Sequence, residues 1–134
     1  MPPQTQQYPD PGDLLFAYGT LKRRGQYHHL IAEIGAEFVG QGQLIIPYPL
    51  ILAEYPCLLD QPGSGLCDKG EVFRIRKPED WRKLDWLEDH PGEYKRRVEP
   101  VRIDGGRMMA WTYFYRWPQK LQPDLLPVEE FPID

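Results

Sequence analysis

Residues 94–117 read YKRRVEPVRIDGGRMMAWTYFYRW, and this stretch decides the fold class. Its centre, Asp104-Gly105-Gly106, separates two segments rich in β-branched and aromatic residues. An Asp-Gly pair between two such segments is a strong signal for a β-hairpin, because both central residues of the favoured tight turn need a positive φ. We therefore predict two antiparallel strands, at residues 94–103 and 107–117, joined by this turn.

Shorter strand signals precede the hairpin at residues 14–18, 38–46, 50–54 and 70–75. The first is a buried apolar run that ends at Gly19, and the last alternates between apolar and polar residues. Helical signals are confined to residues 26–34 and 78–89. Six strands with two short helices predict a closed or nearly closed small β-barrel with helices attached, since closure removes exposed sheet edges.

Length and proline content suggest how the chain is divided. A chain of 134 residues with a net charge of −4 fits one domain, and eight of its 15 prolines lie near its two ends. We predict a flexible proline-rich arm at residues 1–12, a folded domain at 13–118 and a proline-rich tail at 119–134. The tail carries Leu125, Leu126, Val128 and Phe131, so we expect it to pack along the domain as an irregular strap.

Composition also argues against several classes of protein. The longest apolar run, residues 44–53, is far shorter than the ~20 residues of a membrane-spanning helix, and no secretory signal is recognisable, so we expect a cytoplasmic protein without membrane contact. Sixteen Lys and Arg against 20 Asp and Glu do not favour nucleic acid, and we expect the basic run 95–97 to be a solvated strand surface. Cys57 and Cys67 should be reduced structural thiols.

One carboxylate of the second helical segment is expected to point inward. At about 100° per residue, with Trp81 at zero, Leu84 lies at about 300°, Leu87 at about 240° and Glu88 at about 340°. Glu88 therefore falls inside the apolar arc, whereas Asp85 and Asp89 fall outside it and should face solvent. An inward Glu88 could cap backbone donors or pair with Arg96 or Arg97, or it could be a general base whose pKa is raised by desolvation.

The other candidate feature is Tyr18-Gly19-Thr20-Leu21, at the end of the first strand. A glycine lets the backbone turn sharply or approach a ligand closely, and the N–H groups of such a turn can bind a carboxylate or an oxyanion. A plain strand-to-helix turn would have the same sequence. We expect Gly19→Val to disrupt this loop through backbone strain.

Other chemistries find little support in the sequence. Three histidines (His28, His29 and His90) do not favour a metal site, and Ser64 lacks the setting of a serine nucleophile. Tyrosines 94, 113 and 115 could donate hydrogen bonds in a cavity, although core packing is the favoured interpretation for each.

Taken together, the motifs resemble those of the gamma-glutamylcyclotransferase-like family, most closely its gamma-glutamylamine cyclotransferase branch. The resemblance spans residues 14–117 and rests on Tyr18-Gly19-Thr20-Leu21-Lys22, Tyr48-Pro49-Leu50, Pro62-Gly63-Ser64-Gly65, Gly70-Glu71-Val72-Phe73, Leu84-Asp85-x-x-Glu88 and Tyr94-x-Arg96. It implies an α+β fold, a small mixed β-barrel with short peripheral helices. It also implies a substrate cavity at the Tyr18–Leu21 loop, Glu88 as the catalytic acid/base, and no metal or cofactor.

The implied reaction turns a γ-glutamyl amine or γ-glutamyl amino acid into 5-oxoproline and a free amine, by attack of the substrate's α-amine on its own γ-carbonyl. The sequence departs from the family after Glu88, where Asp89 and His90-Pro91-Gly92 replace the glycine of many members. This departure bears on the choice of substrate more than on the reaction. The alternative from another class is a non-catalytic barrel of the same fold that binds a small ligand or a peptide.

Overall fold

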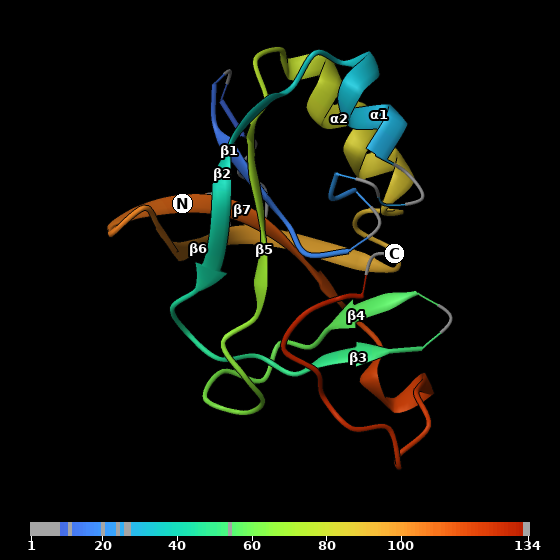
Figure 1. The fold of residues 1–134 in the computed structure, drawn as a ribbon. Helices are drawn as coiled ribbons and strands as arrows, with labels where there is room; N and C mark the ends of the chain where they lie inside the picture. Colours follow the sequence, from blue (N-terminus) through green and yellow to red (C-terminus); the bar gives the residue numbers. More distant parts are fainter. Residues whose placement is uncertain are drawn as a thin grey trace, which may run out of the picture.

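The fold is a closed five-stranded β-barrel (Figure 1). The computed structural model describes residues 9–10, 12–19, 21–23, 25, 28–53 and 55–132. The strands follow one another around the barrel in the order β1 (Leu14–Ala17), β5 (Lys69–Arg74), β2 (Glu37–Leu44), β6 (Tyr94–Ile103) and β7 (Gly106–Tyr115). All neighbouring strands are antiparallel except β1 and β7, which pair in parallel and close the barrel. The predicted mixed barrel is therefore confirmed.

The predicted hairpin is the longest strand pairing of the barrel. Strands β6 and β7 stay in register from Tyr94 opposite Tyr115 to Ile103 opposite Gly106. Two residues form the turn, Asp104 with a φ of 47° and Gly105 with a φ of 74°. Positive φ at both positions is what a two-residue hairpin turn of this kind requires, and it explains the Asp-Gly pair.

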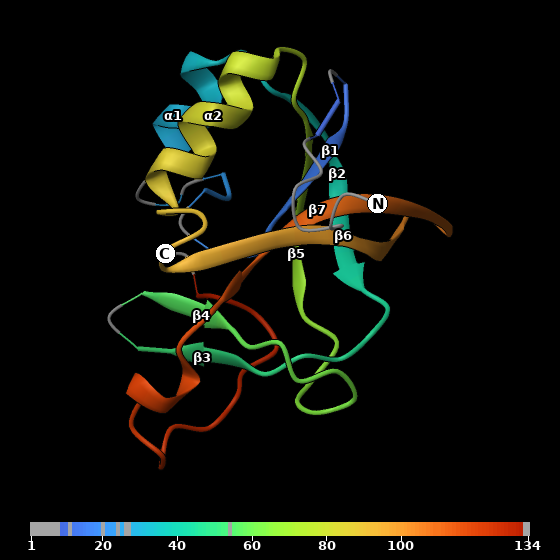
Figure 2. The same cartoon turned by 180° about the vertical axis from the view of Figure 1, so that it is seen from behind.

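Two helices and a small two-stranded ribbon lie on opposite sides of the molecule (Figures 1 and 2). The helices are α1 (His28–Glu33) and α2 (Pro78–Leu87), and the ribbon pairs β3 (Leu50–Leu52) with β4 (Pro56–Leu58). Strand β4 was not predicted, because it is only three residues long and begins with a proline. A short 3-10 helix (Pro118–Lys120) follows β7.

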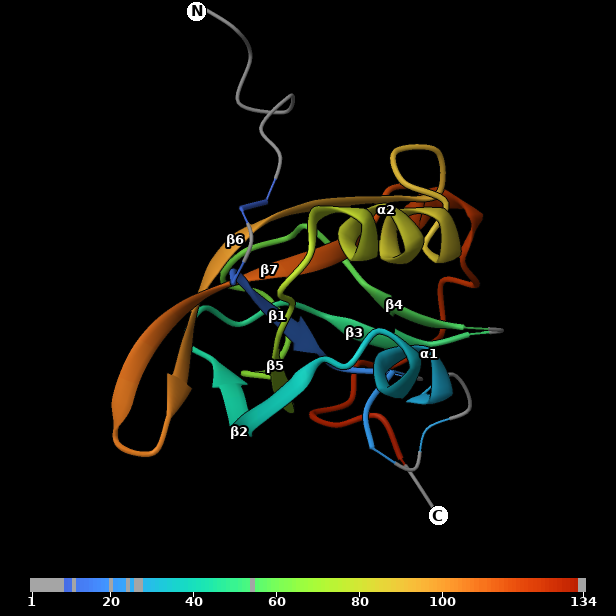
Figure 3. The ribbon, with the colours of Figure 1, turned by 90° about the horizontal axis from the view of Figure 1, so that it is seen from above.

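Strand β1 is buried on both faces, and this places it between two apolar clusters. Leu14 and Phe16 join the cluster that contains Phe114, whereas Leu15 and Ala17 join the one that contains Trp81 of α2. Because α2 packs over the second cluster, its C-terminal end lies beside the end of β1. Figure 3 shows α2 running across this face of the barrel.

The C-terminal tail runs along the barrel as a strap, which we define as residues 121–132. Leu125 packs on one apolar cluster and Val128 on the other. The backbone N–H of Val128 donates to the Leu50 carbonyl at 2.9 Å, and that of Lys69 donates to the Glu129 carbonyl at 2.9 Å. The strap therefore holds a defined course next to β3 and β5.

The basic run 95–97 is a solvated surface only in part, because Lys95 and Arg97 are partly exposed whereas the prediction was wrong for Arg96. Arg96 is buried, and its guanidinium binds the carboxylate of Asp85. Lys95 and Arg97 lie two positions apart on β6, and both contact Asp60, at 2.8 and 2.7 Å. Arg97 also binds Glu99, two residues along the same strand, so three carboxylates balance the three positive charges. Cys57 and Cys67 are free thiols, as predicted.

Within the described residues, no helix has the length and apolar character that crossing a membrane would need.

Candidate active site

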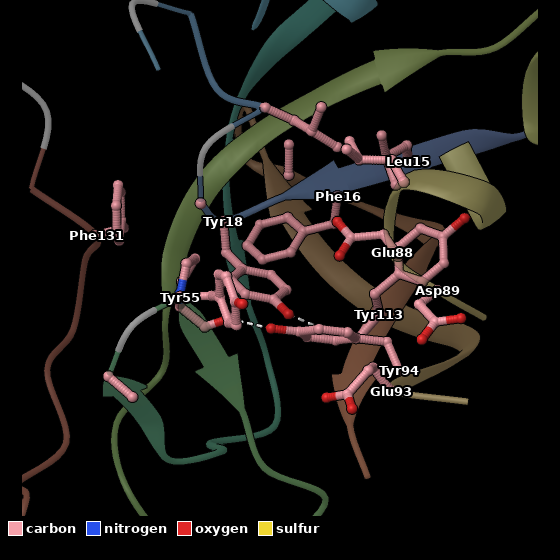
Figure 4. A pocket seen from close by; sticks show the side chains of 16 residues that line it. Leu15, Phe16, Tyr18, Tyr55, Glu88, Asp89, Glu93, Tyr94, Tyr113 and Phe131 are labelled. Atoms are coloured by element: carbon pink, nitrogen blue, oxygen red, sulfur yellow. Dashed lines mark hydrogen bonds between the residues drawn. The ribbon is translucent and has the colours of Figure 1, made fainter. Parts of the chain in front are cut away.

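A pocket of about 720 Å³ opens between the end of β1 and the C-terminal end of α2 (Figure 4). Tyr18, Gly19 and Leu21 line it on one side, and Glu88 lines it on the other. The two candidate features of the sequence, about 65 residues apart, thus meet in one cavity. Thr20, the remaining member of the predicted loop, lies outside the described residues.

The loop after β1 needs glycine for a reason other than the one we expected. Gly19 does not have a positive φ, so the predicted backbone strain of Gly19→Val does not apply. Instead, a Cβ at Gly19 would lie 2.5 Å from Cγ of Pro56 on β4. Glycine is required here because the loop backbone packs closely against the ring of Pro56.

The loop leaves backbone donors available at the pocket. The N–H of Lys22 donates to the Gly19 carbonyl at 3.1 Å and closes a turn. Gly19 and Leu21 lie outside the strands, and among the described residues their backbone N–H groups donate to no backbone carbonyl. The Tyr18 hydroxyl donates to the Tyr113 carbonyl at 2.7 Å, which ties the loop to β7. A carboxylate or a developing oxyanion could accept hydrogen bonds from such free N–H groups.

Glu88 ends the second helix rather than lying within it. Helix α2 finishes at Leu87, and the Glu88 N–H still donates to the Leu84 carbonyl at 3.0 Å. Its carboxylate lines the pocket, and among the described residues no ion pair or side-chain hydrogen bond reaches it. Pairing of Glu88 with Arg96 or Arg97, one of the two interpretations of the sequence, is therefore wrong.

The surroundings of Glu88 favour its protonated form. Burial, and then the negative charge of Asp85, raise the pKa of this carboxyl to about 7. Desolvation is the larger of the two causes, as expected for an inward-facing carboxylate. A carboxyl that titrates near neutral pH can both accept and return a proton under physiological conditions.

Asp85 also faces inward, so the prediction that it points to solvent was wrong. Its carboxylate accepts two hydrogen bonds from Arg96, Nε to Oδ1 at 2.8 Å and Nη2 to Oδ2 at 2.9 Å. The Tyr113 hydroxyl donates to the same Oδ1. The helical wheel placed Asp85 outside the apolar arc, and only the position of Arg96 on β6 shows why it turns in. Asp89 is exposed, as predicted, at the rim of the pocket.

Two of the three candidate tyrosines line the pocket, and both are also buried in the core. Tyr94 donates from its hydroxyl to the Pro56 carbonyl at 2.9 Å, and burial raises its pKa. Burial likewise raises the pKa of Tyr113. Both hydroxyls are therefore neutral donors, and their own hydrogen bonds hold them in place. Tyr115 packs edge-on against Tyr94 in the core and does not line this pocket.

Sequence reasoning missed several contributors to the pocket wall, and two of them come from segments whose position could not be predicted. Pro56 comes from the unpredicted strand β4, and Phe131 comes from the strap. The apolar residues of the tail were a signal for packing, but they did not indicate where on the barrel the tail would lie. In the part of the chain that the structure describes, no cluster of three or more His, Cys, Asp or Glu side chains could hold a metal ion.

Residues 15–131 match the protein family described as "Gamma-glutamyl cyclotransferase, AIG2-like". The chain belongs to this family. The match confirms the family predicted from the motifs, and it extends beyond the predicted domain end at residue 118 into the strap.

Named relatives within the gamma-glutamyl cyclotransferase family come from several animals. The human gamma-glutamylaminecyclotransferase is 40% identical over 100 residues, which are 67% of this chain and 62% of the relative. Gamma-glutamylaminecyclotransferase B of Danio rerio is 33% identical over 121 residues, 84% of this chain and 63% of the relative. The chain thus spans a little under two thirds of the length of both proteins.

A solved structure supports the same assignment. The crystal structure of an AIG2-like protein from Mus musculus superimposes with a TM-score of 0.82 at 28% identity, and the match covers 92% of this chain and 90% of that chain. The predicted fold of the gamma-glutamyl cyclotransferase family is therefore confirmed at the level of three-dimensional structure.

Proposed function

We propose that this chain is a γ-glutamyl cyclotransferase of the cytoplasm that converts a γ-glutamyl amine or γ-glutamyl amino acid into 5-oxoproline and a free amine. Family membership and the names of the relatives indicate cyclotransferase activity. One observation about the site carries the proposal. The Glu88 carboxylate lies in a pocket beside a glycine loop, has no ion-pair partner among the described residues, and has a pKa of about 7.

The reaction requires one group that moves a proton between two nitrogens. The substrate's α-amine attacks its own γ-carbonyl, so a C–N bond forms to close the five-membered ring and the C–N bond to the leaving amine breaks. One proton must leave the attacking nitrogen and one must join the departing nitrogen. Glu88 accepts the first proton as a carboxylate and returns it to the leaving amine, which balances the reaction without any other reactant.

The loop supplies the other requirement, which is orientation. An α-amine and a γ-carbonyl in one molecule react only when the substrate is folded into the attack geometry, and holding that conformer contributes much of the rate. We assign this role to Tyr18, Gly19, Thr20 and Leu21. The free N–H groups of Gly19 and Leu21 are suited to the substrate's carboxylate or to the oxyanion that develops during attack.

Asp85 acts as a positioning residue in this proposal. It is anchored to Arg96 and Tyr113 on two barrel strands, one turn of helix before Glu88. This anchor fixes the C-terminal end of α2 against the barrel. It therefore holds the Glu88 carboxylate at the pocket and not at the solvent-exposed side of the helix.

The test is release of 5-oxoproline, measured by mass spectrometry, from γ-glutamyl-ε-lysine, a γ-glutamyl dipeptide, glutathione and a γ-glutamyl alkylamine. Glu88→Gln should lower kcat by about a thousandfold, because glutamine cannot accept the proton, while the affinity for 5-oxoproline stays close to that of the wild type. Glu79→Gln changes an exposed glutamate of the same helix and serves as the matched control.

Two outcomes would contradict the proposal. Turnover by Glu88→Gln at the wild-type rate would remove Glu88 from the chemistry. Absence of product from every substrate, in a folded wild-type protein that still binds 5-oxoproline, would favour the non-catalytic binding barrel of the same fold.

A further inference from the structure

The strap contributes an aromatic wall to the proposed active site. Phe131 lines the same pocket as Glu88, and Figure 4 shows its ring at the opposite end of that pocket, beyond Tyr18 and Tyr55. The proposed chemistry does not use this side chain. With the reacting γ-carbonyl beside Glu88, we assign the amine part of a γ-glutamyl substrate to this other end of the pocket.

Phe131 also lines a second cavity. That cavity measures about 760 Å³ and is lined by Lys22, Arg23, Gln41, Glu71, Glu130 and Pro132 together with Phe131. Its lining carries charges of both signs, whereas the charged residues that line the main pocket, Glu88, Asp89 and Glu93, are all acidic. Phe131 is the one described residue that lines both cavities, so the two cavities meet at this residue.

A buried lysine holds this part of the strap in place. Lys22 is 4% exposed, and its ammonium group donates to the Phe131 carbonyl at 2.9 Å. It also lies 3.8 Å from the carboxylate of Glu130. A buried ammonium group is stable only when it is paired, so the strap and Lys22 depend on each other. Because Lys22 follows Leu21 directly, the substrate loop and the strap are tied together.

A second set of contacts fixes the strap just before Phe131, at Val128 and Glu129. Lys69 donates from its backbone to the Glu129 carbonyl at 2.9 Å, and its ammonium group lies 3.1 Å from the Glu129 carboxylate. Val128 donates to Leu50. Contacts on both sides of Glu130 therefore set where Phe131 lies.

We propose that Phe131 is a specificity-determining residue that closes the main pocket opposite Glu88 and limits the length of the amine released. The inference rests on the proposed cyclotransferase function. A short amine ends within the main pocket. A long amine has to pass Phe131 to reach the second cavity, and the hydrogen bond from Lys22 to the Phe131 carbonyl holds the backbone at this position in place.

The experiment compares two substrates. The short one is the γ-glutamyl amide of methylamine. The long one is the γ-glutamyl amide of an amine with a neutral oligo(ethylene glycol) chain, chosen to suit the polar second cavity. In Phe131→Ala, the ratio of kcat/KM for the long substrate to that for the short one should rise about tenfold, the scale on which pocket size discriminates between substrates. Lys22→Met, which removes the tie but keeps the buried chain, should shift the ratio in the same direction.

Leu126→Ala is the matched control, because Leu126 lies in the same strap, is 81% exposed and lines neither cavity. It should leave the ratio at the wild-type value. A ratio that is unchanged or lower in Phe131→Ala, in a variant with an unaltered melting temperature, would overturn the inference.

A second measurement separates this inference from the proposed function. Binding of both amides is measured by calorimetry in the Glu88→Gln background, with and without Phe131→Ala, so no turnover is needed. An increase of about tenfold in the relative affinity for the long amide supports the proposed role of Phe131 even if no substrate reacts. An unchanged relative affinity overturns it, whatever the activity of the wild type.

Discussion

Arg96 and Asp85 form a two-pronged ion pair, with N–O distances of 2.8 and 2.9 Å, between strand β6 and the last turn of helix α2. The Arg96 side chain is 2% exposed and that of Asp85 is 17% exposed, so the pair lies inside the protein. Bidentate pairs of this kind fix direction as well as distance. Glu88 follows Asp85 by three residues, and its place in the pocket therefore depends on this contact.

Asp85→Asn should move the pH profile to lower pH. In the wild type we expect kcat/KM to rise with pH through about 7, because Glu88 must be ionised to accept a proton and its pKa is about 7. The negative charge of Asp85 raises that pKa, so its removal lowers the pH at which the rise occurs. Deprotonation of the substrate's own α-ammonium group also makes kcat/KM rise with pH, and this second rise should stay at the same pH in the variant. A profile that stays fixed or moves to higher pH would contradict this prediction.

The same substitution should also destabilise the fold, by about 3 kcal/mol, since it leaves the buried Arg96 without its full partner. Denaturant unfolding measures this change. Glu79→Gln is the control for both measurements, because it removes an exposed carboxylate near the other end of α2.

Gly19→Ala should damage both stability and activity. The new methyl group would lie 2.5 Å from Cγ of Pro56, so the loop or β4 has to shift, at a cost of about 1–3 kcal/mol. The shift would move the N–H groups that we assign to substrate binding, and 5-oxoproline release should fall with it. Gly106→Ala is the matched control, because its nearest neighbour, the Ile103 carbonyl, lies at an ordinary 3.5 Å. Wild-type behaviour of Gly19→Ala would refute the close-approach explanation.

Asp68→Asn should change how stability depends on pH. Asp68 is fully buried, and neither of its carboxylate oxygens has a hydrogen-bond partner among the described residues. Burial, and then the charge of Glu129, raise its pKa to about 8. The folded protein therefore binds a proton that the unfolded chain releases near pH 4, and wild-type stability falls as pH rises from about 4 to about 8.

The size of this effect follows from linkage. Between pH 6 and pH 8 the wild type should lose up to about 3 kcal/mol through Asp68, and Asp68→Asn should not lose this part. Thermal unfolding at both pH values, with Asp124→Asn as an exposed control in the strap, measures the difference. Equal losses in Asp68→Asn and the wild type would show that Asp68 is ionised at both pH values.

The barrel could be predicted from sequence because its strongest signals are local. The Asp104-Gly105 turn fixes the pairing of β6 with β7, and alternation or apolar runs mark β1, β2 and β5. Strand β4 was not predicted because its first residue is Pro56 and because three residues are too few to show an alternating pattern. The prediction of Glu88 as an inward carboxylate was also local, since it needs only the helical repeat.

What could not be predicted depends on partners distant in sequence. Asp85 turns inward because Arg96 of β6 lies opposite, and Lys95 and Arg97 likewise pair with the distant Asp60. Phe131 lines the pocket because Lys22 and Lys69 fix the strap. The periodicity of residues within a segment does not indicate these contacts, because they form only when the folded barrel brings distant segments together.

The ties between the start and the end of the chain have a consequence for folding. Tyr18 binds the Tyr113 carbonyl across 95 positions, and Lys22 binds the Phe131 carbonyl across 109. Contacts of such separation have the highest loop-closure entropy and are slow to form. During synthesis on the ribosome, the glycine loop emerges long before β7 and the strap that complete its pocket. The nascent chain therefore acquires its pocket in a late step, after nearly all of the barrel sequence is available to pair.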